Sequence, residues 1–393
     1  MRAACITWIA SFSLFFTCAG VAAPFLPAND AQVLEHLAFK RGDSASAELR
    51  QLRVALAAEP ANVEAATRLA KALYSMQEAE GDPRFIGYAQ AVLRPWWAMP
   101  RPPIEVLEMR IALRQYNHDF EGALEDVSQM IAREPKDGRG WSWRLVINTV
   151  LANYDQARAD CDPIGEFSGD LAGAACLAQI ESLTGNSRLG YQRLSRALER
   201  RATTSPMHKL VVWTMLGEMA QRMDETRLAD RHFRQAIALG IVDVDLRMRY
   251  ADFLLDGGRH AEVVALLRHA SGSDTLLLRL AIAETAMRSS AGAKHVEVLR
   301  SRFEAARKRG DITHLRAEAR FALTLGNDPF RALALAQENW TQQREPDDAR
   351  VLLESALAAR QPQAARPALD WVKRTGHEDP IIRRLAKQIA GQK

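Results

Sequence analysis

The amino-acid sequence predicts an all-α protein that is built from repeated helical hairpins. Apolar residues follow one another at steps of three and four, and residues of similar type recur 34 positions apart along one long stretch. A period of this length is typical of a helix–turn–helix unit, which cannot bury its apolar face alone and therefore stacks on its neighbours. The matched pairs are Leu107 and Trp141, Phe120 and Tyr154, Ala123 and Ala157, and Val127 and Cys161.

The clearest single unit begins near residue 210. One face of its first helix and one face of its second carry the residues that meet where two helices cross: Trp213, Leu216, Gly217, Ala220, Ala229, Phe233 and Ala236. Their order resembles the signature of the tetratricopeptide repeat (TPR) family. The resemblance implies a right-handed superhelical solenoid of about eight or nine TPR-like helix pairs, in which the first helices line a concave face.

The remaining helices follow from local start and stop signals. We expect helices at 44–58, 63–76 and 83–93, before a segment at 94–103 that is rich in proline and contains Trp96 and Trp97. The two tryptophans either fill an irregular junction or offer a docking site for a peptide or a sugar. Glycine and proline between residues 162 and 169 should shorten or break a helix before the pattern restarts at Leu171.

Towards the C-terminus we expect a long helix at 295–308, hairpins that turn at 326–329 and near Pro362, and a capping helix at 380–390. No change in composition divides the chain, so we predict one solenoid over residues 23–393. Its clearest units are 104–137, 138–164, 210–243 and 244–271, and the pattern is least regular in the first, fourth and seventh units.

Residues 1–22 have the composition of a secretory signal peptide. A basic start at Arg2 precedes an apolar run from Ile6 to Phe16, which small residues follow. This order predicts a cleavable leader rather than an anchor, because the apolar run is shorter than the roughly 18 residues of a membrane span. We place the cut after Ala22, because Pro24 directly after the cut would be unfavourable. An uncleaved anchor and a lipoprotein modified at Cys18 are the alternatives. We therefore expect an exported protein of a Gram-negative periplasm, with no membrane span after removal of the leader.

Two cysteines, Cys161 and Cys176, remain after the leader is removed. They fall in consecutive helices of the predicted stack, and an oxidising compartment permits a disulfide between them. Such a bond would stabilise the fold by about 3 kcal/mol. The alternative is a pair of buried free thiols, and the spacing does not favour a redox or metal role.

The sequence gives no sign of catalysis. Apolar residues make up 48% and charged residues 25%, and the formal net charge of +4 is too small to predict a nucleic-acid partner. Nucleotide-binding, hydrolase and metalloprotease motifs are absent, so we predict no cofactor, no metal and no enzymatic activity. The enzyme alternative is a glycan hydrolase that resembles lytic transglycosylases, with Glu181 or Glu354 as its acid. Both glutamates fall inside repeat helices, where no lysozyme-like domain surrounds them.

The TPR resemblance assigns a set of side chains to the concave face. Their charges are mixed, so they do not reproduce the lysine and asparagine clamp with which some family members hold a C-terminal carboxylate. We expect a scaffold or assembly factor of the cell envelope that binds a protein or peptide there; a purely structural spacer is the alternative. The sequence leaves the partner and the oligomeric state open. The candidate groove residues are Glu105, Glu108, Gln115, Tyr116, Arg139, Ser142, Thr149, Gln179, Ser182, Thr214, Glu218, Gln221 and Arg222.

Overall fold

The computed structural model describes residues 44–80, 82–201, 203–269 and 272–391, and all regular structure within these ranges is helical. The predicted leader and its cleavage site lie outside the described residues. Among the described residues, the helices after α1(Ser44–Ala58) form nine successive hairpins, in agreement with the eight or nine pairs that the sequence predicts. No helix of the described residues is long and apolar enough to cross a membrane.

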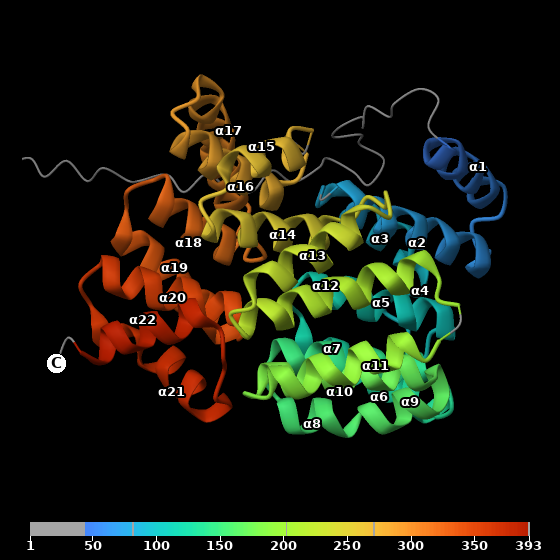
Figure 1. Cartoon of the computed structure of the whole chain (residues 1–393). Helices are drawn as coiled ribbons and strands as arrows, with labels where there is room; N and C mark the ends of the chain where they lie inside the picture. Colours follow the sequence, from blue (N-terminus) through green and yellow to red (C-terminus); the bar gives the residue numbers. More distant parts are fainter. Residues whose placement is uncertain (1–43, 81, 202, 270–271, 392–393) are drawn as a thin grey trace, which may run out of the picture.

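The hairpins and the helices between them run in chain order (Figure 1). They are α2(Val63–Glu80) with α3(Arg84–Val92), then α4(Arg94–Trp97), α5(Ile104–Tyr116) with α6(Phe120–Arg133), α7(Gly138–Val150) with α8(Tyr154–Ala159) and α9(Cys161–Ser168), α10(Asp170–Leu183) with α11(Ser187–Glu199), α12(Pro206–Arg222) with α13(Thr226–Ile237), α14(Val244–Asp256) with α15(His260–Leu267), α16(Asp274–Ala286) with α17(Ser290–Lys308), α18(Leu315–Thr324) with α19(Pro329–Gln342), and α20(Pro346–Ala358) with η1(Pro362–Ala365) and α21(Arg366–Thr375), followed by α22(Pro380–Ala390).

Close packing of α12 on α13 explains the residue types of the repeat pattern. Phe233 is fully buried, and its ring lies about 3.0 Å from the position that a Cβ atom would take on Gly217. A larger residue at Gly217 would push the two helices apart, because packed interiors have no spare volume. Phe233 also stacks on Tyr250 of α14, with ring centroids 5.5 Å apart. The same side chain therefore joins one hairpin to the next.

Two irregular stretches show where the helical pattern is interrupted. The expected break before Leu171 is present: two short helices, α8 and α9, meet at Asp160, and Gly169, with φ +96°, separates α9 from α10. Pro163 lies in the first turn of α9, where no helical hydrogen bond needs its missing N–H. The expected boundary at residue 164 thus falls inside α9. In the proline-rich segment, Trp96 is buried in the N-terminal apolar core, as a side chain that fills a junction.

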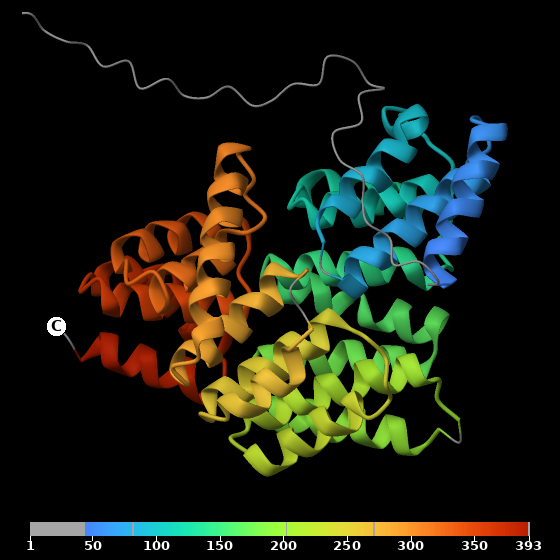
Figure 2. The same ribbon diagram turned by 90° about the horizontal axis from the view of Figure 1, so that it is seen from above.

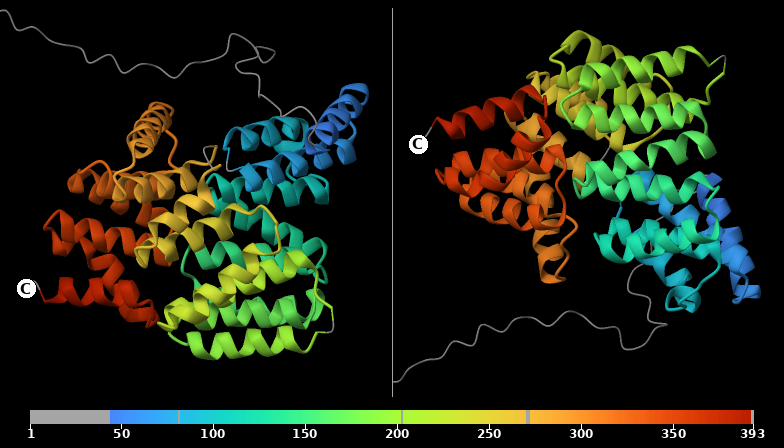
Figure 3. Two further views of the ribbon diagram at one scale, coloured as in Figure 1. Left: turned by 45° about the horizontal axis from the view of Figure 1, so that its top comes forward. Right: turned by 90° about the horizontal axis from the view of Figure 1, so that it is seen from below.

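The C-terminal hairpins pack against the middle of the chain, so the solenoid closes on itself. One apolar core combines residues between 145 and 183 with residues between 319 and 389. The backbone N–H of Ser187 donates to the Glu378 carboxylate at 2.7 Å, across 191 positions of sequence. Figure 3 shows α20 to α22 (red) beside the green helices, and Figure 2 shows the N-terminal and C-terminal hairpins to either side of the middle ones. In an open solenoid each repeat contacts only its neighbours, so this closure decides how much of the concave face stays accessible.

Candidate binding groove

The expected groove residues near the N-terminus form local contacts. Arg139 donates to Glu108 at 2.6 Å, which joins α7 to α5 at an exposed position. Glu105 is exposed, and Gln115 is half-buried. Burial raises the pKa of Tyr116 to about 12, and nearby aspartates add to the effect.

Three expected groove residues are buried inside the helix stack: Thr149, Ser182 and Thr214. The Thr214 hydroxyl donates to the carbonyl of Leu210 at 2.8 Å within α12. The Ser182 hydroxyl accepts from Arg222 at 2.8 Å and is fully buried. The sequence placed all three on the wet side of their helices, but the turns of the stack cover their side chains.

A network of paired, mostly half-buried charges lies on the concave side of the superhelix, and we call it the central charge network. It lines three small cavities of about 130, 80 and 50 Å³. Among the expected groove residues, Thr149, Gln179, Glu218, Gln221 and Arg222 lie here. Sequence reasoning missed the other members, which come from the first helices of later hairpins: Arg249, Asp252, Asp256, Arg279, Arg316, Arg320, Asp347, Arg350 and Glu354.

The central charge network is held by ion pairs between distant first helices. Asp252 on α14 accepts from Arg279 on α16 and from Arg320 on α18, each at 2.6 Å. Burial alone would raise the pKa of Asp252, but the two guanidinium groups outweigh it and hold the pKa well below its usual value. Arg350 on α20 donates to Asp256 at 2.7 Å, across 94 positions. Glu218 on α12 pairs with Arg249 on α14.

A second buried group of charges anchors α20. Asp348 is fully buried and accepts from Arg316 at 3.2 Å and from the side chain of Asn339 at 2.8 Å. Burial raises the pKa of Asp348, and Arg316 opposes that shift. Because these charges neutralise one another, the small cavities between them are lined largely by groups that already have a partner.

An apolar pocket of about 260 Å³ lies beside the central charge network. Gln179 and Met215 line both this pocket and one of the charged cavities, so the two share part of their walls. The expected groove residue Ser142 lies here, although its hydroxyl donates to the carbonyl of Gly138 at 2.8 Å. The apolar lining comes from α7, α9, α10 and α12: Leu145, Ile164, Leu171, Ala172, Ala175, Cys176, Val211, Val212 and Met215.

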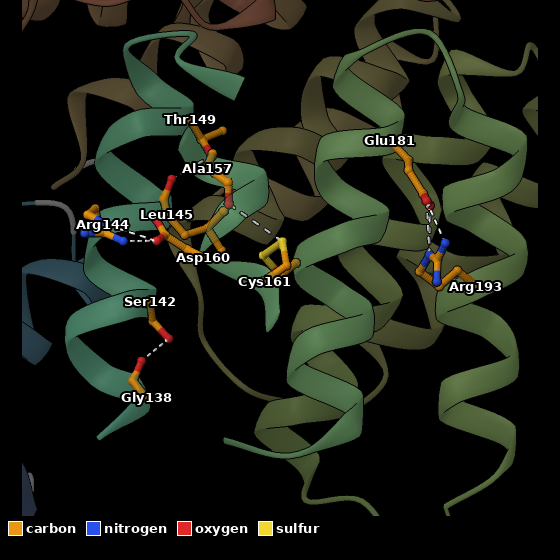
Figure 4. The surroundings of a disulfide bond; sticks show 11 residues. Gly138, Ser142, Arg144, Leu145, Thr149, Ala157, Asp160, Cys161, Glu181 and Arg193 are labelled. Atoms are coloured by element: carbon orange, nitrogen blue, oxygen red, sulfur yellow. Dashed lines mark hydrogen bonds and ion pairs between the residues drawn. A yellow bond between two sulfur atoms is a disulfide. The ribbon is translucent and has the colours of Figure 1, made fainter. Parts of the chain in front are cut away.

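A disulfide joins two walls of the apolar pocket. Cys161 of α9 is bonded to Cys176 of α10, with Cα atoms 5.4 Å apart. Figure 4 shows this bond between the helices, with Ser142 and Leu145 on the neighbouring α7. Both sulfurs are buried, and Cys176 itself lines the pocket. The disulfide therefore fixes the distance between α9 and α10 on the pocket floor.

The two glutamates of the enzyme alternative are ion-paired. Arg193 donates to both oxygens of Glu181, at 3.2 and 3.0 Å, and Arg350 donates to Glu354 at 2.9 Å. A general acid needs the opposite surroundings, an apolar pocket that favours the neutral carboxyl group. Among the described residues, no group of three or more His, Cys, Asp or Glu side chains could hold a metal ion.

Comparison with known proteins yields solved structures alone. No family model matches the sequence, and no curated protein matches it. Each of the following similar structures covers 88% of this chain. A human IFIT1 dimer with m7Gppp-AAAA has 12% identity, 86% of that chain covered and a TM-score of 0.45. Yeast Tom70 has 13% identity, 92% covered and a TM-score of 0.32, and a tetratricopeptide repeat protein from Parabacteroides merdae has 11% identity, 100% covered and a TM-score of 0.28. Likenesses at these identities and TM-scores say nothing about what this chain binds. Its own helical hairpins and its repeat unit at α12 and α13 make the fold TPR-like.

Proposed function

We propose that this protein is an exported helical-repeat scaffold of the cell envelope, and that it holds a segment of a partner protein at the apolar pocket. The observation that carries the binding part is the pocket itself, which opens between the first helices α7, α10 and α12. Concave apolar pockets with a few polar groups at their edge are the usual form of recognition sites. The proposed export rests on the leader pattern of residues 1–22.

The rest of the molecule supports this placement. The central charge network already satisfies the interior of the concave side, so a partner has little to gain there. Val211, by contrast, is 46% exposed at the edge of the apolar pocket. An apolar side chain of a partner would remove this surface and the pocket lining from water, which favours association.

Site-specific photocrosslinking tests the binding site. A photoreactive residue at Val211 should crosslink one envelope protein in the cell. The same residue at Val242, which is 52% exposed in the connection between α13 and α14, serves as the matched control and should not. The change Ala175→Phe, which fills the pocket, should reduce the crosslink at Val211. Identical crosslinked proteins from both positions would contradict the proposal.

Fractionation of cells tests the export. The mature chain should be recovered from the periplasm, and its N-terminal residue should be Ala23. A cytoplasmic chain that still begins at Met1 would refute export, while it would leave the binding site to the crosslinking experiment.

A further inference from the structure

A second depression borders the apolar pocket, between α10, α11 and the residues that follow α11. Its volume is about 540 Å³, and we call it the basic furrow. Four arginines line it, whereas Asp170 is the sole carboxylate among the described residues of its lining: the arginines are Arg193, Arg196, Arg200 and Arg201. Arg193 is paired with Glu181. The other three guanidinium groups have no hydrogen-bond or ion-pair partner within the part of the chain that the structure describes.

The basic furrow and the apolar pocket are neighbours, because Leu171 and Arg201 line both. The Arg201 guanidinium lies at the N-terminus of α10, with Nη2 3.9 Å from the position of a Cβ atom on Gly169. The N-terminus of a helix carries a partial positive charge, which adds to that of the arginine. His208 lies at the edge of the apolar pocket and Leu189 in the basic furrow, so each depression offers both polar and apolar contacts.

We propose that the two depressions together bind an extended acidic segment of the partner. One large apolar side chain enters the apolar pocket, and neighbouring Asp or Glu carboxylates pair with Arg196, Arg200 and Arg201. Arginine suits this role because its planar guanidinium binds a carboxylate with two parallel hydrogen bonds. The proposal rests on the proposed scaffold function and specifies the chemistry of the segment that the scaffold binds.

The shape of the surface favours a peptide as its occupant. A closed apolar cavity of about 150 Å³ holds a benzene ring, so the pocket here has room for an aromatic side chain. Helices α7, α9, α10 and α12 enclose it. A lipid surface would instead require apolar groups that protrude into the bilayer interface. A chain with acidic residues on either side of one apolar residue matches both the concavity and the unpaired positive charge.

Fluorescence anisotropy with labelled peptides tests this proposal on the full mature chain. The probe is a short Gly/Ser peptide with one central Phe and Glu on both sides, and its comparators replace Phe by Ser or every Glu by Lys. The acidic Phe peptide should bind at least about ten-fold more tightly than either comparator. The double change Arg200→Glu and Arg201→Glu should remove this preference. The control pair Arg227→Glu and Arg231→Glu, on exposed arginines of α13, should change affinity by less than about two-fold.

The outcomes separate this proposal from the scaffold function. Equal binding of the acidic and lysine peptides, or equal effects of the two arginine pairs, would overturn the acidic preference. Binding of phosphatidylglycerol vesicles that depends on Arg200 and Arg201, without peptide binding, would assign the furrow to a membrane and overturn it also. If Val211 crosslinks a partner while no acidic peptide binds, the scaffold function stands and the acidic segment is refuted. If neither occurs, both proposals fail.

Discussion

His377 should make the closure of the solenoid sensitive to acid. This residue lies between α21 and α22, is 1% exposed, and packs on Trp371 with ring centroids 5.0 Å apart. Its Nδ1 lies 3.4 Å from the carbonyl oxygen of Leu183, the last residue of α10. Burial, with a contribution from Arg222, lowers the pKa of His377 from 6.5 to about 3. The folded C-terminal hairpin therefore requires a neutral imidazole.

The direction and size of the effect follow from linkage between protonation and folding. Because the folded pKa is depressed, the stabilisation is present above pH 6.5 and is lost as the pH falls towards 3. At about pH 5 the unfolded histidine is protonated and the folded one is not. The free energy of unfolding should then be lower by about 2 kcal/mol than at neutral pH, because a pH of about 5 lies about 1.5 units below the unfolded-state pKa of 6.5.

Urea unfolding between about pH 5 and about pH 7.5 measures this effect. The variant His377→Gln keeps a side-chain donor but does not titrate, so its free energy of unfolding should depend less on pH than that of the native chain. His269→Gln changes an exposed histidine and serves as the control, which should follow the native curve. Asp348 titrates in the opposite sense, since its raised pKa makes folding more favourable as the pH falls; the comparison between variants removes its contribution. Parallel curves for the native chain and His377→Gln would refute the reasoning.

Four further changes test the packing, each by urea unfolding. Removing the Cys161–Cys176 disulfide with both cysteines changed to Ala should cost about 3 kcal/mol, and equal stability of the reduced and oxidised native chain would contradict this. Gly190→Ala should cost about 1–3 kcal/mol, because its Cβ atom would lie 2.5 Å from a backbone carbonyl oxygen of α10. Gly87→Ala, in the middle of α3 with nothing within 4 Å of its new Cβ atom, should instead raise the free energy of unfolding by about 1 kcal/mol. Equal effects of the two glycine changes would contradict the packing described for α10 and α11. Arg320→Ala should cost about 1–2 kcal/mol by leaving the half-buried Asp252 carboxylate with Arg279 as its remaining partner, and equal stability of the variant and the native chain would show that the central charge network contributes little.

The fold was predictable because its signals are local. The first and last described helices, Ser44–Ala58 and Pro380–Ala390, have the bounds that their apolar spacing and flanking prolines predict. Gly217 and Phe233 lie within one hairpin, so their spacing in the sequence already encodes their contact. The pairing of Cys161 with Cys176 is similar in kind, since consecutive helices of a stack are neighbours.

The interior was not predictable, because its contacts join residues that are far apart in the chain. Arg320 meets Asp252 across 68 positions, and Arg350 meets Asp256 across 94. No period in the sequence encodes these distances. One signal was available: the first helices of later hairpins carry Arg and Asp at three- and four-residue steps, as in Asp347 and Arg350. Opposite charges on the first-helix face, which lines the concave side of a stack, indicate ion pairs between distant first helices there.

The apolar pocket and the basic furrow were missed for a related reason. The TPR resemblance assigned the groove to first helices, whereas α9 supplies a wall of the pocket and the residues after α11 supply Arg200 and Arg201. The position of α9 depends on how the chain passes Asp160 and Gly169, which is a property of the three-dimensional path. A groove taken from an ideal repeat cannot include such contributions.

Hydrogen–deuterium exchange of the mature chain with and without the acidic Phe peptide tests most directly whether the apolar pocket and the basic furrow form the binding site. We predict slower exchange at the N-terminal turns of α10 and α12 and at the end of α11, with α14, α18 and α20 unchanged, because the central charge network already closes that region. Protection confined to α14, α18 and α20 would place the ligand inside the superhelix and contradict the account.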